Sequence, residues 1–181
     1  MTMNVLGIVG SPRRGGNTET LVDEVLAGSQ EADAVTEKVI LNELRISPCQ
    51  ACNACYKTRT CVQKDDMAAL LEQMDKSEVW VLGTPVYWWG PTAQFKAFLD
   101  RFYGAHTVTF KGRRVILVIP LGGSAQYARY TVGMLTDVLN YLGTDLVATV
   151  VAPGSEGLGS VRRNTTVLAQ ARSAGRNVIT D

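Results

Sequence analysis

Four cysteines lie close together in the sequence, at Cys49, Cys52, Cys55 and Cys61. This spacing brings several thiolates onto one short segment, which is what a cubane iron–sulfur cluster needs from its ligands. Four thiolates also suit a tetrahedral zinc site, and two of them would suffice for a redox-active or regulatory thiol pair. The spacing by itself leaves these three chemistries open.

The loop from Gly10 to Thr18, with the sequence GSPRRGGNT, is a second feature that can do chemistry. The start of a helix offers unpaired backbone N–H groups and partial positive charge, so a phosphate there is held by amides, by the Ser11 and Thr18 hydroxyls and by Arg13. The loop contains neither Gly-Lys-Ser/Thr nor GxGxxG, which favours a mononucleotide over ATP chemistry or a dinucleotide. The alternative is a plain glycine-rich turn before a capped helix.

Alternating strand-like and helix-like segments must position both features. We expect strands at residues 4–9, 35–41, 78–83, 114–121 and 145–151, and helices at residues 17–28, 65–74, 91–102, 125–142 and 161–174. Asn17 or Thr18 is expected to cap the first helix and Gly28 to close it. The pattern predicts an α/β, flavodoxin-like three-layer sandwich with a five-stranded parallel sheet of order 2-1-3-4-5. Ligands of such sheets bind beyond the carboxyl ends of the strands.

Composition narrows the class of protein. A length of 181 residues favours a single domain over residues 1–181, with a cysteine-rich insertion at about 45–64. The net charge of +1 argues against nucleic-acid and anionic-membrane partners. His106 is the only histidine, which excludes multi-histidine metal sites. The first residues do not resemble a secretion signal and the cysteines are not spread as disulfides, so we expect a cytoplasmic protein.

Three motifs, GSPRRGGNT, TPVYWWGPTAQFKAFLDR and PLGG, resemble the NADPH-dependent FMN reductase and iron–sulfur flavoprotein families. The resemblance spans most of the chain and implies an FMN-binding domain. It assigns the FMN phosphate to Ser11, Arg13, Asn17 and Thr18. It assigns the isoalloxazine ring to Pro85, Val86, Tyr87, Trp88, Gly90, Gly122, Gly123 and Ser124. It also implies that Cys49, Cys52, Cys55 and Cys61 hold a [4Fe-4S] cluster, although related flavin reductases can carry cysteines without one.

The loop from Pro85 to Gly90 offers what a flavin ring requires. A planar ring binds apolar or aromatic surface, and backbone amides stabilise the negative charge that grows on it during reduction. Hydride passes directly from a nicotinamide to the ring, so no catalytic acid or base is expected. Trp88 and Trp89 have an alternative role as core or interface aromatics. Lys96 and Asp100, four residues apart, are expected to form a helix ion pair.

Two functions follow as hypotheses. The first is an FMN-binding oxidoreductase that moves electrons from NAD(P)H to free flavin, a quinone or another small acceptor. The second is a relay between a ferredoxin-like donor, a [4Fe-4S] cluster and FMN; a flavin-storing module is a third and simpler possibility. Because the flavin loops are apolar, we expect a homodimer or homotetramer with Trp88 or Trp89 near the interface.

Overall fold

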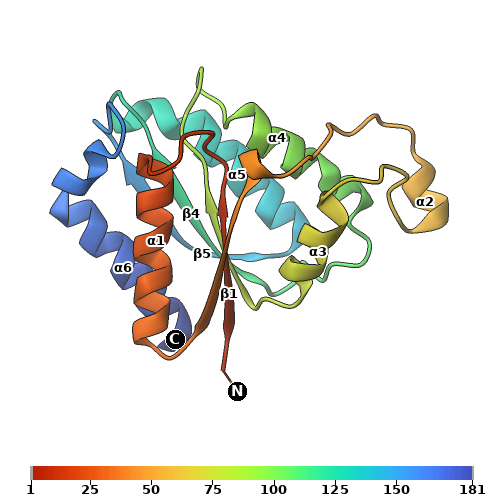
Figure 1. Ribbon diagram of the computed structural model, residues 1–181, viewed down its shortest axis with the longest axis horizontal. Coiled ribbons are helices and arrows are strands. Elements are labelled where there is room, and N and C mark those ends of the chain that lie inside the picture. Colours follow the sequence, from red (N-terminus) through yellow and green to blue (C-terminus); the bar gives the residue numbers. More distant parts are fainter. Residues whose placement is uncertain (1, 181) are drawn as a thin grey trace.

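The computed structural model describes residues 2–180, so Met1 and Asp181 of the expected domain lie outside the described residues. Its strands form one parallel sheet of order β2-β1-β3-β4-β5 (Figure 1). The strands are β1 (Asn4–Val9), β2 (Val35–Ile40), β3 (Val79–Gly83), β4 (Arg114–Pro120) and β5 (Asp145–Ala152). This order confirms the flavodoxin-like fold.

Helices cover both faces of the sheet. The α-helices are α1 (Asn17–Glu31), α2 (Ala54–Thr58), α3 (Met67–Asp75), α4 (Ala93–Asp100), α5 (Arg129–Leu142) and α6 (Thr165–Thr180). Short 3₁₀ turns are η1 (Leu41–Glu43), η2 (Arg101–Gly104), η3 (Ala125–Ala128) and η4 (Ser160–Arg163). Helices α1 and α6 lie on one face, and α3, α4 and α5 on the other, which gives the expected three layers (Figure 1).

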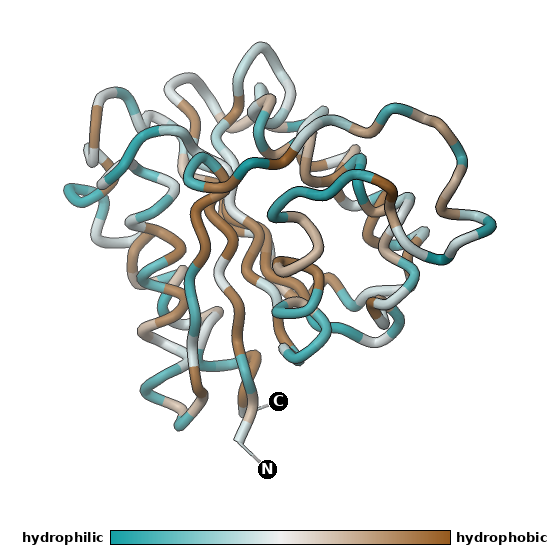
Figure 2. The backbone as a smooth tube through the Cα atoms, turned by 45° about the vertical axis from the view of Figure 1, so that its right-hand side comes forward, coloured by the Kyte–Doolittle hydropathy of each residue, from teal (hydrophilic) through white to brown (hydrophobic). Residues whose placement is uncertain are grey.

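Alternation along the strands divides the core into two apolar clusters. On β1, Leu6 and Ile8 pack toward α3, α4 and α5, whereas Val5 and Val9 pack toward α1 and α6. Successive strand side chains point to opposite faces, and a sheet covered on both sides therefore consists of nearly continuous apolar runs. The central strands β1, β3 and β4 are accordingly hydrophobic along most of their length, whereas the edge strand β2 carries Thr36, Glu37 and Lys38 (Figure 2).

The first helix differs from expectation at both ends. Its N-cap is Gly16 rather than Asn17 or Thr18, both of which are helical. Gly28 does not close it, because the helix continues to Glu31. A Cβ at Gly28 would collide with the backbone carbonyl of Arg172, and a Cβ at Gly175 of α6 would collide with that of Val25. The glycine therefore allows close packing of two helices instead of ending one.

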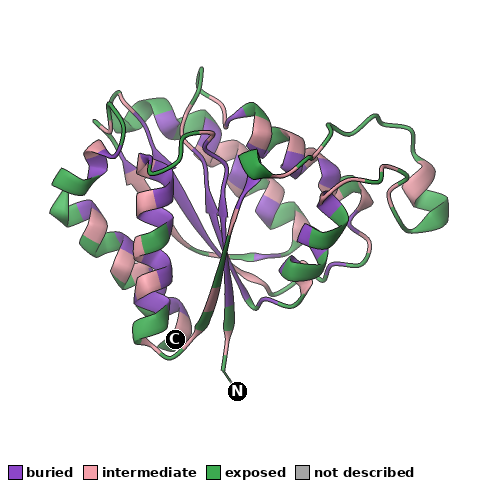
Figure 3. Cartoon of the chain, viewed as in Figure 1, coloured by how far each residue is buried: buried purple, intermediate pink, exposed green. Residues whose placement is uncertain are grey.

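Other boundaries shift by local chemistry. Helix α4 begins after Thr92, whose hydroxyl accepts from the N–H of Phe95, so Pro91 precedes the helix instead of opening it. The expected helices at 125–142 and 161–174 each begin with a 3₁₀ turn, and the last one extends to Thr180. The cysteine-rich segment projects from the α3 and α4 side and is largely exposed (Figure 3). Within residues 2–180, no helix is long and apolar enough to cross a membrane.

Candidate functional site

The loops that follow β1, β3, β4 and β5 meet at the carboxyl edge of the sheet and surround a cavity of about 240 Å³. We call it the edge cavity. Its lining includes eight residues that the sequence assigned to FMN: Ser11, Arg13, Asn17, Thr18, Pro85, Val86, Tyr87 and Gly122. The other lining residues are Gly16, Pro120, Leu121, Ser155, Glu156, Gly157 and Leu158. The parallel topology thus brings together segments that are far apart in sequence.

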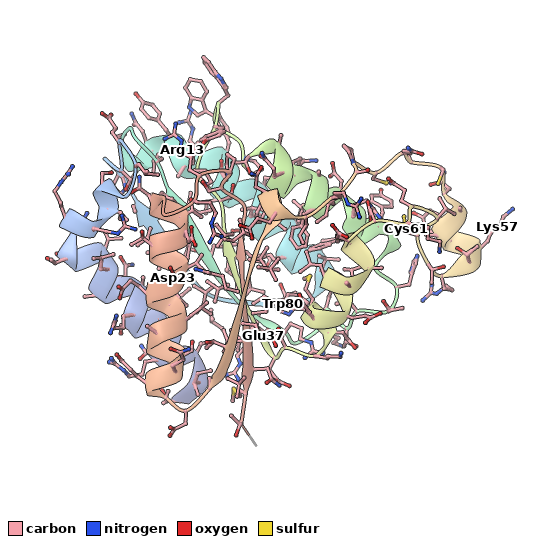
Figure 4. The ribbon with its side chains drawn as sticks, in the orientation of Figure 1. Arg13, Asp23, Glu37, Lys57, Cys61 and Trp80 are labelled. Carbon is pink, nitrogen blue, oxygen red and sulfur yellow. The ribbon has the colours of Figure 1, made fainter. Side chains whose placement is uncertain are left out.

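The start of α1 forms one wall of the edge cavity. The N-cap Gly16 has no side chain to accept from the first N–H groups of the helix, so within residues 2–180 these donors have no side-chain cap and are available to a ligand. Ser11 and Thr18 are buried beside them, and Ser11 Oγ accepts from the N–H of Arg13 at 3.2 Å. The Ser11 hydroxyl keeps its proton to donate, and the Arg13 side chain is exposed at the mouth (Figure 4). This donor set suits an anion.

The buried carboxylate of Glu19 anchors the loop between β1 and α1. Glu19 Oε2 accepts from the N–H of Gly15 at 2.7 Å, and Oε1 accepts from Lys38 Nζ at 3.0 Å. Arg14 adds a longer ion pair at 3.7 Å. Burial by itself raises the pKa of Glu19, but the Gly15 N–H, Lys38 and Arg14 outweigh burial and hold that pKa below its usual value. Glu19 is therefore ionised at neutral pH and acts as an anchor of the loop.

Asn17 joins this helix start to the loop after β5. Its Nδ2 donates to the carbonyl oxygens of Ser155 and Gly157, at 2.8 and 2.9 Å. Its Oδ1 accepts from the N–H of Val161 at 3.0 Å. The side-chain amide is thus engaged by protein groups on both sides. Asn17 shapes the edge cavity, and its backbone N–H remains available at the helix start.

The loop after β5 is the part of the cavity that sequence reasoning did not assign. No role was assigned to residues 154–159 from the sequence, but Ser155, Glu156, Gly157 and Leu158 line the cavity. A Cβ at Gly122 would lie 3.0 Å from Glu156 Cγ, so the loops after β4 and β5 are in close contact. The available signal was positional: this turn follows a parallel strand and so lies at the same edge as the other loops.

The remaining ring-assigned residues lie beside the edge cavity or outside it. A neighbouring aromatic hollow is lined by Val86, Trp88, Trp89, Leu121, Gly122, Gly123 and Tyr127. It shares Val86, Leu121 and Gly122 with the edge cavity, so the two are adjacent. In the described range 2–180, Gly90 and Ser124 line neither of them. Gly90 closes the turn that carries the tryptophans, and Ser124 precedes η3.

The tryptophan turn has an unusual backbone. Tyr87 and Gly90 exchange two hydrogen bonds, at 2.8 and 3.0 Å, across Trp88 and Trp89. Both tryptophans have positive φ angles, 49° and 61°, a region that non-glycine residues rarely occupy. The Trp88 side chain is 92% exposed. Thr131 Oγ1 donates to the Trp89 carbonyl at 2.9 Å and fastens the turn to α5. Such local strain is commonly found at binding sites.

The four cysteines line a second cavity, of about 350 Å³, which we call the cysteine cavity. Cys55 lies on α2, and Cys55 Sγ approaches the Tyr103 carbonyl at 3.6 Å. Within residues 2–180, no three Cys, His, Asp or Glu side chains lie close enough together to bind one metal ion. A cluster spreads its ligands around a larger body than a single ion. In Figure 4, Cys61 lies on the side of the molecule away from Arg13.

Left-handed residues shape the wall of the cysteine cavity. Ala51 and Asn53, which stand between the first three cysteines, have φ angles of 52° and 58°. A Cβ at Gly104 would lie 3.3 Å from Cys61 Cβ and 3.7 Å from Cys55 Cβ.

The expected pair of Lys96 and Asp100 is present on α4 at 2.6 Å and is exposed. Asp100 also borders the cysteine cavity.

The sheet topology defines a flavodoxin-like protein, and the edge cavity lies at the ends of its strands. A profile of the family described as NADPH-dependent FMN reductase matches residues 3–157. The chain belongs to this family, whose members are FMN-dependent NAD(P)H oxidoreductases. Family membership confirms the resemblance that the motifs GSPRRGGNT, TPVYWWGPTAQFKAFLDR and PLGG indicated.

Individual proteins that are similar to the chain include iron–sulfur flavoproteins and an oxidoreductase of known structure. An iron–sulfur flavoprotein of Archaeoglobus fulgidus is 35% identical over 160 residues, which cover 87% of this chain and 68% of the relative. One from Methanocaldococcus jannaschii is 40% identical over 99 residues, which cover 55% of this chain and 51% of the relative. The solved structure of an NAD(P)H:quinone oxidoreductase from Methanothermobacter marburgensis has a TM-score of 0.79 at 18% identity, covering 98% and 96% of the two chains. That last likeness shows a shared fold.

Proposed function

We propose that the chain binds FMN in the edge cavity and uses it to move electrons from NAD(P)H to a small acceptor. The observation that carries this proposal is the convergence of the α1 start and the Pro85–Tyr87 segment on one cavity. The FMN phosphate would be held by the free N–H groups of α1, the Ser11 and Thr18 hydroxyls, and Arg13. Asn17 would hold the opposite loop in position.

FMN, when bound, supplies the capacity to accept a hydride and to release electrons. The chain's own task is to position the ring and stabilise its charge. Val86, which lines both the edge cavity and the aromatic hollow, and Tyr87, which lines the edge cavity, offer partly apolar surface. Trp88 and Trp89 extend that surface outward, where an acceptor with a flat ring, such as free flavin or a quinone, would stack. No acid–base residue is required.

Anaerobic mixing of FMN-loaded protein with NADPH or NADH tests this function. We expect the flavin absorbance to bleach with at least one nicotinamide and to recover when a quinone or free FMN is added. A flavin-storing module predicts bound FMN that neither nicotinamide reduces, and that result would reject the oxidoreductase proposal.

A second function, the electron relay, is favoured by the cysteine cavity. All four cysteines face one space of about 350 Å³, as ligands of one cluster must. Both of the relatives described above bear the name iron–sulfur flavoprotein. Under this proposal Cys49, Cys52, Cys55 and Cys61 hold [4Fe-4S], and single electrons pass between a ferredoxin-like donor, the cluster and FMN.

Metal analysis of protein purified without oxygen separates the alternatives. About four irons per chain, with acid-labile sulfide and broad visible absorbance, would support the relay. One zinc per chain would indicate a tetrahedral thiolate site instead. Neither metal, with full flavin content, would leave the NAD(P)H oxidoreductase as the function of the chain.

The expected oligomer remains part of the proposal. Trp88 is almost fully exposed, and the aromatic hollow beside it continues onto the surface. Large exposed apolar residues of this kind commonly mark interfaces. We expect a homodimer or homotetramer in light scattering at micromolar concentration, and a monomer under those conditions would count against it.

A further inference from the structure

Arg101 is a buried arginine at the base of the cysteine-rich insertion. It lies directly after α4, and its side chain is 2% exposed. Its Nη1 donates to Asp65 Oδ2 at 2.6 Å and to the Ser47 carbonyl at 2.9 Å. Its Nη2 donates to Asp65 Oδ1 at 3.1 Å. The guanidinium therefore binds the residues on both sides of the four cysteines, one before Cys49 and one after Cys61.

The two ends of the insertion also bind each other. The N–H of Ser47 donates to Asp65 Oδ2 at 3.0 Å. The N–H of Arg45 donates to Asp66 Oδ2 at 2.7 Å, and the N–H of Asp66 donates to the Arg45 carbonyl at 3.1 Å. Arg101 lies at the centre of this closed neck, because its rigid, planar guanidinium hydrogen-bonds to both ends. The insertion is thus held shut at its base by protein groups alone.

The same guanidinium reaches a cysteine. Arg101 Nη2 lies 3.4 Å from Cys61 Sγ, and Arg101 lines the cysteine cavity. Its Nε is buried and has no hydrogen-bond partner among residues 2–180. A buried donor without a partner lowers the stability of the fold unless an acceptor is present in the functional protein. Cluster sulfides and cysteine thiolates are such acceptors, so the residues fit the group proposed above.

We propose that Arg101 is a positioning residue for the cluster, which holds the neck of the insertion closed and tunes the cluster by hydrogen bonding to Cys61 Sγ. This inference rests on the proposed [4Fe-4S] assignment. The reduction potential of an iron–sulfur cluster depends on charge and on hydrogen bonds to its sulfurs. One-electron reduction adds negative charge to the sulfurs, so a cationic N–H donor stabilises the reduced form more than the oxidised form. Arg101 therefore raises the potential.

Arg101→Lys tests the inference, with Arg113→Lys as the matched control. Lysine keeps the charge but loses the planar fork that spans Asp65, Ser47 and Cys61. Arg113 also donates to several acceptors, the carbonyls of Thr109, Ser77 and Asp75, and lies outside the lining of the cysteine cavity. Both variants therefore remove an arginine that donates to several acceptors, but of these two arginines only Arg101 contacts a cysteine.

Two quantities are measured on the anaerobically reconstituted protein. The first is the reduction potential, monitored by visible and electron paramagnetic resonance spectra, and the second is the rate of iron loss to a chelator. We expect Arg101→Lys to shift the potential to more negative values and to speed iron loss about tenfold, as is usual for groups that orient metal ligands. Arg113→Lys should match the wild type. An Arg101→Lys protein with unchanged potential and iron retention overturns the inference.

A double variant guards against misfolding. Arg101→Met alone would leave the buried Asp65 carboxylate without its partner, so Arg101→Met is combined with Asp65→Asn to remove both charges. We expect this folded double variant to show the same negative shift and faster iron loss. Wild-type protein that takes up no iron overturns the cluster assignment and this inference with it. A different result, in which the wild type binds iron and the variants have the same potential and iron retention as the wild type, overturns only the role of Arg101.

Discussion

The side-chain amide of Asn17, at the start of α1, donates to the carbonyl oxygen of Ser155 in the loop after β5, at 2.8 Å. The two residues are far apart in the sequence, and both line the edge cavity. The contact means that the start of α1 and the loop after β5 are one hydrogen-bonded unit. Loss of this amide should therefore loosen the cavity without removing any hydroxyl or charge from it.

We predict that Asn17→Ala weakens FMN binding about tenfold and exposes the loop at 154–159 to limited proteolysis. Each lost hydrogen bond costs about 1 kcal/mol, and 1.4 kcal/mol corresponds to a factor of ten. Gln30→Ala is the control, because Gln30 hydrogen-bonds Thr36 from the far end of the same helix. Equal FMN affinity for Asn17→Ala and wild type would show that the outer loop takes no part in binding.

Glu19 gives a prediction about pH. A carboxyl whose pKa is lowered in the folded protein stabilises the fold at pH values above its unfolded pKa, and the contribution fades as the pH falls below that value. The pKa of Glu19 is lowered from its usual 4.5. Wild type should thus lose stability on acidification below about pH 5 more steeply than Glu19→Gln does.

Urea unfolding at several pH values measures this difference. At pH 7 we expect Glu19→Gln to be less stable than wild type by about 1–2 kcal/mol, since its bonds to charged partners weaken. The gap should narrow as the pH falls. Glu37→Gln, which removes an exposed carboxylate from β2, is the control. Parallel stability curves for Glu19→Gln and wild type would contradict the proposed anchor.

Close packing of α1 against α6 predicts opposite effects of two glycine substitutions. Gly28→Ala should destabilise the protein by about 3 kcal/mol, because its Cβ meets the Arg172 backbone and the helices must separate. Gly133→Ala on α5 should be neutral or stabilising by up to about 1 kcal/mol, because within residues 2–180 its Cβ would meet nothing within 4 Å beyond its own neighbours and helix backbone, and alanine favours helix. Thermal unfolding distinguishes them, and similar melting temperatures for the two would refute the packing argument.

Trp88 should show a trade between stability and function. Its φ of 49° is a strained backbone conformation for a non-glycine residue, and the residue is 92% exposed. Trp88→Gly is predicted to raise the free energy of unfolding by about 1 kcal/mol and to weaken binding of FMN or of a flat acceptor. Tyr141→Ala, which removes an equally exposed aromatic from α5, should change neither property. If Trp88→Gly lowers stability, the turn is not strained.

The sequence predicted the layers of the fold well because parallel strands buried on both faces are continuous apolar runs, as in the segment 114–121. It misplaced the end of the first helix at Gly28, because glycine serves both as a helix terminator and as a contact point between helices. Only the position of α6 distinguishes these two roles. Local pattern carries no information about a partner that lies more than a hundred residues away.

The candidate site shows the same division. Ser11 and Thr18 were found because a helix start after the first strand is a local feature with a known chemistry. The contribution of Ser155 and Glu156 depends on where β5 ends relative to β1, which the topology sets. Arg101 was visible only as part of a motif, since its contacts with Asp65 and Cys61 depend on how the insertion folds back.

The central claim is that the start of α1 binds the phosphate of FMN. Its most direct test is equilibrium titration of flavin-free protein with FMN and with riboflavin, which lacks the phosphate. We predict that wild type binds FMN at least about 100-fold more tightly, since two hydrogen bonds to a charged group are worth about 1.5–3 kcal/mol each. Most of that preference should disappear in the Ser11→Ala/Thr18→Ala double variant. It should persist in Thr20→Val, whose buried hydroxyl has no partner among residues 2–180. Equal affinity of the wild type for FMN and riboflavin would contradict the account.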